Sequence, residues 1–214
     1  SMGGSLMDYF IGDPITISPD IETCFSEAPV LLPDCYIPPY EFFEPSPVKM
    51  SRIDYGLPDN VPVFCCFNAP YKIDPVIFEC WMNILRRVTG AVLWLRGGQS
   101  EIALKNEADK ADIDHQRLIF TSGRVERTIH LKRHSLADIF LDTHYYNAHA
   151  TALDALTAGL PILTCPGPSP SGRATSSMLS TLGLTELVAP TLQAYEDTAV
   201  KLVEERFTGL KDRL

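Results

Sequence analysis

The stretch that decides the fold runs from residue 138 to residue 167 and reads DIFLDTHYYNAHATALDALTAGLPILTCPG. It begins with the apolar run 139–141, which is typical of a strand buried on both faces of a parallel sheet. A polar loop follows, and a helix then begins near Asn147 and ends at Gly159, a residue suited to a left-handed helix end. The run 160–165 predicts another strand. The polar loop should therefore lie at the carboxyl end of the sheet, where phosphate-bearing ligands bind in open α/β folds.

The alternation of strand and helix continues on both sides of this stretch. Before it, the pattern predicts strands at 63–67, 91–95 and 117–120, and helices at 74–88, 100–111 and 125–136. After it, the pattern predicts a helix at 171–182, a short strand at 186–189 and an amphipathic helix at 192–207. This order predicts an α/β fold, a doubly wound, Rossmann-like parallel sheet with helices on both faces, over residues 61–214.

Residues 6–60 differ from the rest because prolines recur throughout them and prevent long regular elements. We expect an irregular arm with short extended pieces at 7–11 and 31–36. Its apolar residues favour an arm that wraps the neighbouring domain over a free linker; they are Tyr36, Ile37, Tyr40, Phe42 and Phe43. The opening residues 1–5, SMGGS, are interpreted as an expression scar.

Composition excludes several classes of function. The net charge of −9 and the isoelectric point near 5.0 argue against a nucleic-acid surface, which needs clustered Lys and Arg. No apolar run approaches the length of a membrane span. The six cysteines form no C-x-x-C pair and indicate reduced, buried thiols in a cytoplasmic protein.

Several familiar motifs do not occur in the sequence. It contains neither the G-x-x-x-x-G-K-[ST] phosphate loop nor G-x-G-x-x-G after the first strand, and no G-x-S-x-G nucleophile elbow. His130 and His134 have the i, i+4 spacing of metal ligands on a helix, but H-E-x-x-H is not present. We therefore expect no metal.

The first candidate residues are basic. Lys72 follows the first strand of the predicted sheet, where an ammonium group can neutralise a phosphate. Arg127, His130 and Arg133 share one helix face, with Arg133 suited to a phosphate and the His130 ring to stacking on a base. For these three residues a solvated basic face is an equally good interpretation of the spacing.

The second group of candidates lies at the start of the helix in the deciding stretch. His149 and Thr151 stand where side-chain and backbone donors can converge on an anion. Asp154 follows Thr151 by three residues and should face the same way, so that its carboxylate can accept hydrogen bonds from a ribose diol. Asn147 is better suited to supporting the turn. The weaker candidates are Asp142, Gly97 and Gly98.

Four segments together resemble the O-linked N-acetylglucosamine transferases. They are FNAPYKIDP (67–75), VLWLRGG (92–98), LADIFLDTHYYNAHATALDALTAGLPILTCPG (136–167) and SGRATSSMLSTLGLTELVA (171–189). Members of that family are inverting UDP-sugar glycosyltransferases of the GT-B class, with tetratricopeptide repeats ahead of two Rossmann-like lobes. The resemblance implies that this chain is the second lobe. MDYF (7–10) resembles the final strand of the first lobe, so residues 6–60 are expected to combine a remnant of that lobe with a connecting arm.

The resemblance also implies roles for the candidate residues. Lys72 is expected to bind the UDP diphosphate and stabilise the leaving group, His130 to pack on the uracil, and Arg127 and Arg133 to flank the nucleotide. His149 and Thr151 are expected to hold the phosphates, and Asp154 the ribose. Two positions depart from the family pattern: Ala69 replaces a glutamine and Ala150 a threonine.

The sequence therefore predicts the donor-binding lobe of an enzyme that transfers GlcNAc from UDP-GlcNAc to Ser or Thr of a protein or peptide acceptor. The general base is unknown, and the first lobe and the repeats are expected outside this chain, so the chain alone should lack full activity. One alternative is a related transferase with another donor such as GDP-fucose. Another is a degenerate, non-enzymatic nucleotide-binding or interaction lobe.

Overall fold

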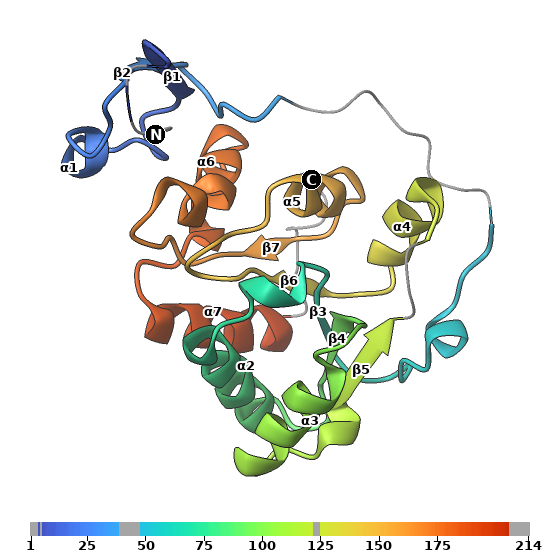
Figure 1. Cartoon of the computed structure of the whole chain (residues 1–214). Helices are drawn as coiled ribbons and strands as arrows, with labels where there is room; N and C mark the ends of the chain where they lie inside the picture. Colours follow the sequence, from blue (N-terminus) through green and yellow to red (C-terminus); the bar gives the residue numbers. More distant parts are fainter. Residues whose placement is uncertain (1–3, 5, 39–47, 122–124, 206–214) are drawn as a thin grey trace.

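The computed structural model describes residues 4, 6–38, 48–121 and 125–205, and its centre is a five-stranded parallel sheet. The strands lie in the order β5-β4-β3-β6-β7 (Figure 1). Their bounds are β3 Val63–Cys66, β4 Val92–Arg96, β5 Leu118–Thr121, β6 Ile139–Leu141 and β7 Ile162–Leu163. The predicted doubly wound parallel sheet is confirmed.

The middle strands are buried on both faces because helices cover both sides of the sheet. All four residues of β3 are buried, and so are all three of β6. Trp94 of β4 is fully buried and packs edge-on against Phe67 with ring centroids 4.9 Å apart. These continuous apolar strands explain why the sequence shows no alternation of polar and apolar residues there.

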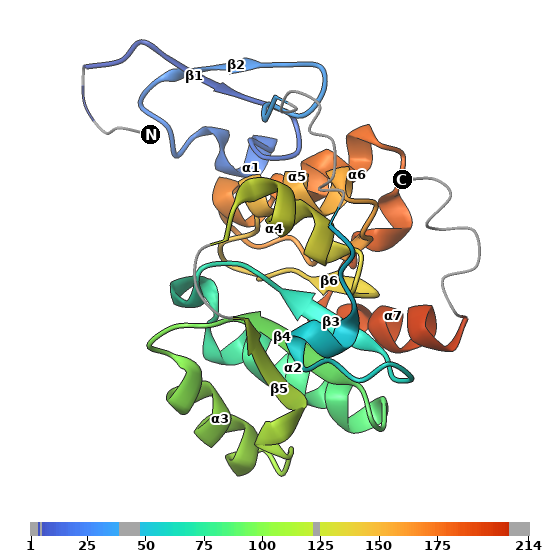
Figure 2. The same ribbon diagram turned by 90° about the vertical axis from the view of Figure 1, so that its right-hand side faces the viewer.

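The helices divide between the two faces according to the direction of the strand crossovers. On one side lie α2 Pro75–Arg87, α3 Glu101–Lys110 and α7 Leu192–Glu204; on the other lie α4 Arg127–His134, α5 Ala150–Thr157 and α6 Ala174–Thr181 (Figure 2). Right-handed crossovers produce this division, because the chain moves outward from β3 through β4 to β5 and then returns to β6 and β7. The direction of winding therefore changes between β3 and β6.

Two predicted helix boundaries are confirmed in atomic detail. Asp74 caps α2, and its Oδ1 accepts hydrogen bonds from the amides of Val76 at 2.9 Å and Ile77 at 3.1 Å, with Pro75 as the first helical residue. Gly159 follows α5 with a φ of +71°, the left-handed conformation that glycine adopts without strain.

Other elements are shorter than predicted. The strand predicted at 186–189 is wrong: a 3-10 turn, η5 Thr185–Leu187, lies there, and only a single bridge joins Val188 to Thr164. The predicted strand 160–165 is reduced to β7 because prolines at 161 and 166 flank it. The helix predicted from residue 171 begins at Ala174, after a 3-10 turn at Pro170–Gly172. The helix predicted at 125–136 spans Arg127–His134.

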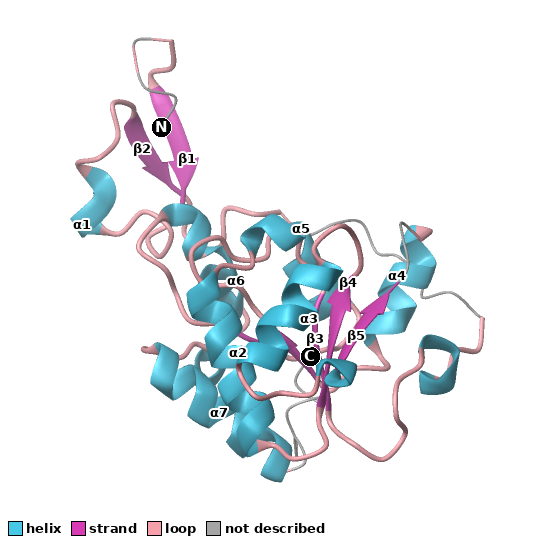
Figure 3. Cartoon of the chain, turned by 60° about the horizontal axis from the view of Figure 1, so that its bottom comes forward, coloured by secondary structure: helices cyan, strands magenta, loops and turns pink. Residues whose placement is uncertain are grey.

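The described part of the arm contains only short elements, as expected: β1 Tyr9–Gly12, α1 Pro19–Glu22, β2 Ala28–Leu31 and η1 Arg52–Tyr55. β1 and β2 form a two-stranded parallel ribbon that stands apart from the main sheet (Figure 3). β2 begins three residues before the predicted piece at 31–36. Residues 40, 42 and 43, part of the basis for expecting a wrapping arm, lie outside the described residues.

Several contacts attach the arm to the domain, including an ion pair of Arg173 with Asp20 at 3.4 Å and a hydrogen bond from the Cys35 amide to Thr181 Oγ1 at 3.1 Å. The buried Asp13 carboxylate accepts hydrogen bonds from Ser177 Oγ of α6 at 2.8 Å and from the Tyr36 amide at 3.1 Å. Arg52 forms an ion pair with Asp138 at 2.9 Å, and its Nε donates to the Leu136 carbonyl at 3.0 Å. These contacts agree with an arm that packs against the domain.

All six cysteines are free thiols, as predicted, but they are not all buried. Four of them, Cys65, Cys66, Cys80 and Cys165, lie in the core, where burial raises the pKa of each thiol. Cys35 is half-buried and Cys24 is exposed on the arm, where no apolar layer covers it. Among the described helices, none is long and apolar enough to cross a membrane.

The fully buried His134 should make the fold sensitive to acid. Its Nδ1 donates to the His130 carbonyl at 2.7 Å, and its ring packs edge-on against Phe67. Burial, with the nearby His130 and Arg133, lowers the pKa of His134 to about 3. The unfolded chain binds this proton near pH 6.5, so the contribution of His134 is complete above that pH. As the pH falls below 6.5, this contribution is lost, and the free energy of unfolding decreases by about 1.4 kcal/mol per pH unit.

We expect His134→Asn, which keeps a donor for the His130 carbonyl, to flatten the dependence of the unfolding free energy on pH between 6.5 and 4. The slope should fall by about 1.4 kcal/mol per pH unit, the value for one proton. Urea unfolding at several pH values measures this slope. The control His115→Asn changes an exposed ring beside Asp109 and should not flatten the curve. Equal slopes for wild type and His134→Asn would contradict the assignment.

Candidate nucleotide-binding site

The candidate site lies where the direction of winding changes, at the carboxyl ends of β3 and β6. These strands are neighbours, with Phe64 opposite Ile139 and Cys65 opposite Phe140. Their following connections leave toward opposite faces of the sheet, which opens a crevice between the two loops. One loop carries η2 Pro70–Lys72, and the other, residues 142–149, leads into α5.

The loop at 142–149 is held by the fully buried Asp142 carboxylate. Oδ1 accepts hydrogen bonds from the amides of Thr143 at 2.8 Å and Ala148 at 2.7 Å, and from Asn68 Nδ2 at 3.2 Å. Oδ2 accepts from Thr164 Oγ1 at 2.9 Å. Burial raises the pKa of Asp142, and these hydrogen bonds oppose the rise. Asp142, a weak candidate from the sequence, is thus placed to support the loop.

Lys72 and His149 meet at one backbone carbonyl in this crevice. Lys72 Nζ donates to the Asn147 oxygen at 2.8 Å, and His149 Nδ1 donates to the same oxygen at 3.0 Å. The Asn147 side chain itself is buried and donates to the Thr143 carbonyl, in agreement with its predicted role in the turn. Desolvation lowers the pKa of Lys72, and the charge of Asp142 opposes this change.

His149 is the N-cap residue of α5. Its Nδ1 donates to the Asn147 carbonyl, so Nε2 holds the lone pair whenever the ring is neutral. Desolvation and the charge of Lys72 lower the pKa of His149. The side chain of His149 can therefore donate to a phosphate only when its ring is protonated. When the ring is neutral, the backbone amides at the helix start are the donors.

Five of the seven candidate residues line one open cavity of about 700 Å³ beside this crevice. Its walls come from the ends of β3 and β4, the start of α5 and one face of α4. The lining residues are Phe67, Arg96, Val125, Arg127, His130, Arg133, Ala150, Thr151 and Asp154. The predicted shared face of Arg127, His130 and Arg133 is thus found, and Thr151 and Asp154 face the same way, as predicted.

Asp154 is the acidic centre of this cavity. Arg127 pairs with its Oδ1 at 2.9 Å, and His130 Nε2 lies 3.6 Å from its Oδ2. Burial, with the charges of nearby arginines including Arg133, lowers the pKa of His130 to about 4, so its ring is neutral near pH 7. Burial raises the pKa of Asp154, and Arg127 opposes this rise.

Arg133 is more buried than its predicted role suggests, with 4% of its surface exposed. Its guanidinium lies 4.5 Å from the Phe67 ring centroid, and Nη1 donates to Thr121 Oγ1 at 3.0 Å. Within the described part of the chain, its buried Nε has no hydrogen-bond partner. Arg133 therefore forms part of the cavity wall and places a positive charge there.

Sequence reasoning missed Phe67, Arg96 and Tyr146. Phe67 and Arg96 could have been found because each stands at the carboxyl end of a predicted strand, the same edge as the candidates. The weak candidates Gly97 and Gly98 form the turn after β4 instead. A Cβ on Gly97 would lie 2.4 Å from the Thr121 carbonyl oxygen, and Gly98 donates its amide to Glu101. Tyr146 gives no signal in the sequence, since its role depends on contacts with Lys72 and His149.

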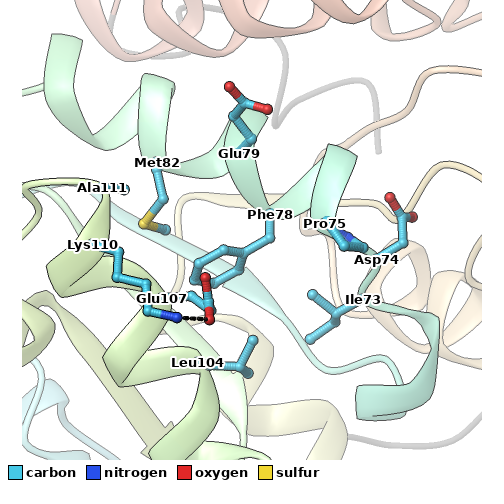
Figure 4. Close-up of a pocket in the computed structure, with 10 residues that line it drawn as sticks. All are labelled: Ile73, Asp74, Pro75, Phe78, Glu79, Met82, Leu104, Glu107, Lys110 and Ala111. Carbon is cyan, nitrogen blue, oxygen red and sulfur yellow. Dashed lines mark hydrogen bonds and ion pairs between the residues drawn. The ribbon is translucent and has the colours of Figure 1, made fainter.

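A second, smaller hollow of about 430 Å³ lies between α2 and α3 (Figure 4). Phe78, Met82 and Leu104 give it an apolar floor, and Glu107 pairs with Lys110 across one end at 2.7 Å. It contains none of the candidate residues. The cavity between α4 and α5 is therefore the candidate site.

Comparison with known proteins identifies the family. Residues 41–212 match the model of glycosyl transferase family 41. A protein of Arabidopsis thaliana described as "Probable UDP-N-acetylglucosamine--peptide N-acetylglucosaminyltransferase SEC" is 34% identical over 209 residues, which cover 94% of this chain and 21% of that protein. The UDP-N-acetylglucosamine--peptide N-acetylglucosaminyltransferase of Caenorhabditis elegans is 40% identical over 154 residues, 71% of this chain and 13% of that protein.

Solved structures agree with these relatives. The O-GlcNAc transferase of Thermobaculum terrenum, solved as its K341M mutant, superposes with a TM-score of 0.83 at 30% identity. The match covers 96% of this chain and 39% of that one. Sucrose-phosphate synthase of Thermosynechococcus elongatus, at 14% identity and a TM-score of 0.51, shares the fold alone. This chain spans about a fifth of the length of its Arabidopsis relative, and it belongs to glycosyl transferase family 41.

Proposed function

We propose that this chain is the donor-binding lobe of a glycosyltransferase that transfers GlcNAc from UDP-GlcNAc to Ser or Thr hydroxyls of a protein acceptor. The observation that carries the proposal is the meeting of Lys72 and His149 at the Asn147 carbonyl, beside a cavity that contains Asp154. This arrangement offers a cation and a helix start for a diphosphate, next to room for a nucleoside. The names of the relatives support UDP-GlcNAc as the donor.

The diphosphate is proposed to lie between the Lys72 ammonium and the start of α5, with Thr151 and the first amides of the helix as further donors. Lys72 is half-buried, so its charge is less screened than that of a surface lysine. When the bond between sugar and phosphate breaks, negative charge grows on the departing UDP, and these groups stabilise it. On this proposal Lys72 is the catalytic residue that this lobe supplies.

The nucleoside is proposed to occupy the cavity between α4 and α5. Asp154 can accept hydrogen bonds from the ribose hydroxyls, and the neutral His130 ring can pack on the uracil. Because Arg127 already pairs with Asp154, the ribose must either share that carboxylate or displace Arg127 from it. Arg133 supports the wall from behind and adds positive charge.

The acceptor site and the general base are proposed to lie in a first GT-B lobe of a longer parent protein, with tetratricopeptide repeats ahead of it. Residues 6–60 are then the remnant of the first lobe with the connecting arm, and residues 61–214 the donor lobe. The two-stranded ribbon supports this division: it is too small to be stable alone, and Tyr9 and Ile11 are 69% and 59% exposed.

We expect no sugar transfer by this chain alone, because the acceptor must be positioned against the donor. The free cysteines support a cytoplasmic location.

A transferase with another donor, such as one that uses GDP-fucose, is the second candidate. Ala150 lines the cavity, where the family pattern has a threonine, and Ala69 precedes η2 without a side-chain cap for that turn. Both changes remove polar groups near the donor. Competition between UDP and GDP for the same site distinguishes these donors. A third possibility is a non-enzymatic lobe, which would bind nucleotide yet stay inactive when joined to its first lobe.

Replacement of Lys72 should weaken diphosphate binding selectively. We expect Lys72→Met to lower the affinity for UDP by roughly 10- to 100-fold, because a charge-assisted hydrogen bond contributes on the order of 1.5–3 kcal/mol. Calorimetry with UDP and with uridine measures this. The matched control is Lys105→Met, on α3, which should bind both ligands as the wild type does. Equal loss of UDP and uridine binding in Lys72→Met would show that the lysine does not act on the phosphates.

Replacement of Asp154 should reveal contact with the ribose. We expect Asp154→Asn to lose several-fold more affinity for UDP than for 2′,3′-dideoxy-UDP, since only UDP offers the hydroxyl donors that the carboxylate accepts. The control Asp109→Asn changes an exposed acid on α3. Parallel losses for both ligands would leave Asp154 with a structural role only, as the partner of Arg127.

A further inference from the structure

Tyr146 contacts Lys72 and His149, the two residues on either side of the proposed diphosphate site. Lys72 Nζ stands over its ring, 3.9 Å from the centroid, and the His149 ring packs edge-on against it with centroids 5.4 Å apart. The same two residues meet again at the carbonyl of the next residue, Asn147. Lys72 and His149 are therefore each held by two groups, the Tyr146 ring and the Asn147 carbonyl.

The backbone that carries Tyr146 is fixed on both sides. Its carbonyl accepts a hydrogen bond from Thr143 Oγ1 at 2.6 Å, and the amide of Asn147 donates to the Ser171 carbonyl at 2.9 Å. The amides of Thr143 and Ala148 are bound by Asp142. The ring thus projects from a fixed stretch of backbone, while 42% of the Tyr146 surface stays exposed.

The contact between the ammonium and the ring face leaves Lys72 able to bind a ligand. An ammonium group has three N–H donors. One of those of Lys72 is used by the Asn147 carbonyl and another points toward the aromatic face, so one remains for a phosphate oxygen. A lysine held in this way keeps less rotational freedom, and it loses less entropy when the phosphate arrives.

We propose that Tyr146 is the positioning residue of the diphosphate site: its aromatic ring holds Lys72 beside His149, the first residue of the α5 start, so that the ammonium group and the helix amides meet the phosphates together. The inference rests on the proposed function, because it takes the diphosphate as the ligand. It assigns the effect to the ring and not to the hydroxyl. Among the described residues the Tyr146 hydroxyl has no hydrogen-bond partner, whereas the ring contacts both Lys72 and His149.

The test compares Tyr146→Phe, which keeps the ring, with Tyr146→Leu, which fills space without an aromatic face. We expect Tyr146→Leu to lose about 2- to 30-fold in affinity for UDP and for inorganic pyrophosphate, the range given by a cation–π contact. Tyr146→Phe should stay within about twofold of the wild type by the same argument. Uridine, which carries no phosphate, should bind all three proteins alike.

Tyr145→Leu is the matched control, because Tyr145 is the adjacent residue, is 49% exposed and packs on His144 instead. It should bind UDP and pyrophosphate as the wild type does. A double-mutant cycle then separates positioning from a general structural effect: in the Lys72→Met background, Tyr146→Leu should cause no further loss of diphosphate affinity.

The possible results distinguish the two proposals. A wild-type chain that binds neither UDP nor pyrophosphate would overturn the donor-lobe function and this inference with it. If the wild type binds and Tyr146→Leu binds equally well or more tightly, only the positioning role is overturned. The ring would then have no effect on phosphate binding or would compete with the phosphate for Lys72. Losses that add fully with Lys72→Met would also overturn it.

Discussion

The buried carboxylate of Asp142 is the interaction on which the candidate site depends. It stands at the end of β6, the strand next to the change of winding direction, and it binds groups from three neighbouring segments. Asn68 belongs to the loop after β3, Thr164 follows β7, and Ala148 precedes α5. A carboxylate removed from water is costly unless its oxygens are fully bonded, so this network has one satisfactory arrangement. That arrangement sets the shape of the crevice.

The groups that face a ligand are supported by this network without being part of it. Lys72 reaches the Asn147 carbonyl from the β3 side, and His149 reaches it from the start of α5. One turn further along the same helix, Asp154 is held by Arg127. The candidate site thus has one cation, Lys72, in the crevice and one acid, Asp154, in the neighbouring cavity, which Arg96, Arg127 and Arg133 also line. A nucleoside diphosphate offers a negatively charged end to Lys72 and a ribose that donates hydrogen bonds to Asp154.

Local rules explain how much of this could be predicted from the sequence. The order of strands and helices from β3 to β7, the cap at Asp74 and the helix end at Gly159 depend on neighbours in sequence, and each was predicted correctly. The common face of Arg127, His130 and Arg133 also followed from helical spacing. The same rule gave the shared direction of Thr151 and Asp154, and all five residues line the cavity. The family resemblance added roles for these residues that spacing alone left open.

Features that depend on distant contacts could not be predicted. The apolar pattern at 186–189 suits a strand, yet only Val188 pairs with the edge of the sheet, and the rest turns toward α7. The burial of Arg133 comes from Phe67 and Thr121, which lie on other elements. Tyr146 looks like an ordinary loop tyrosine until Lys72 and His149 are placed beside it.

The most direct test of this account is the structure of a crystal of this chain soaked with UDP. We expect the diphosphate between Lys72 Nζ and the start of α5, the ribose hydroxyls at the Asp154 carboxylate, and the uracil in the cavity beside His130. UDP bound elsewhere, for example in the hollow between α2 and α3, would contradict it. So would UDP in the same cavity with its phosphates directed away from Lys72.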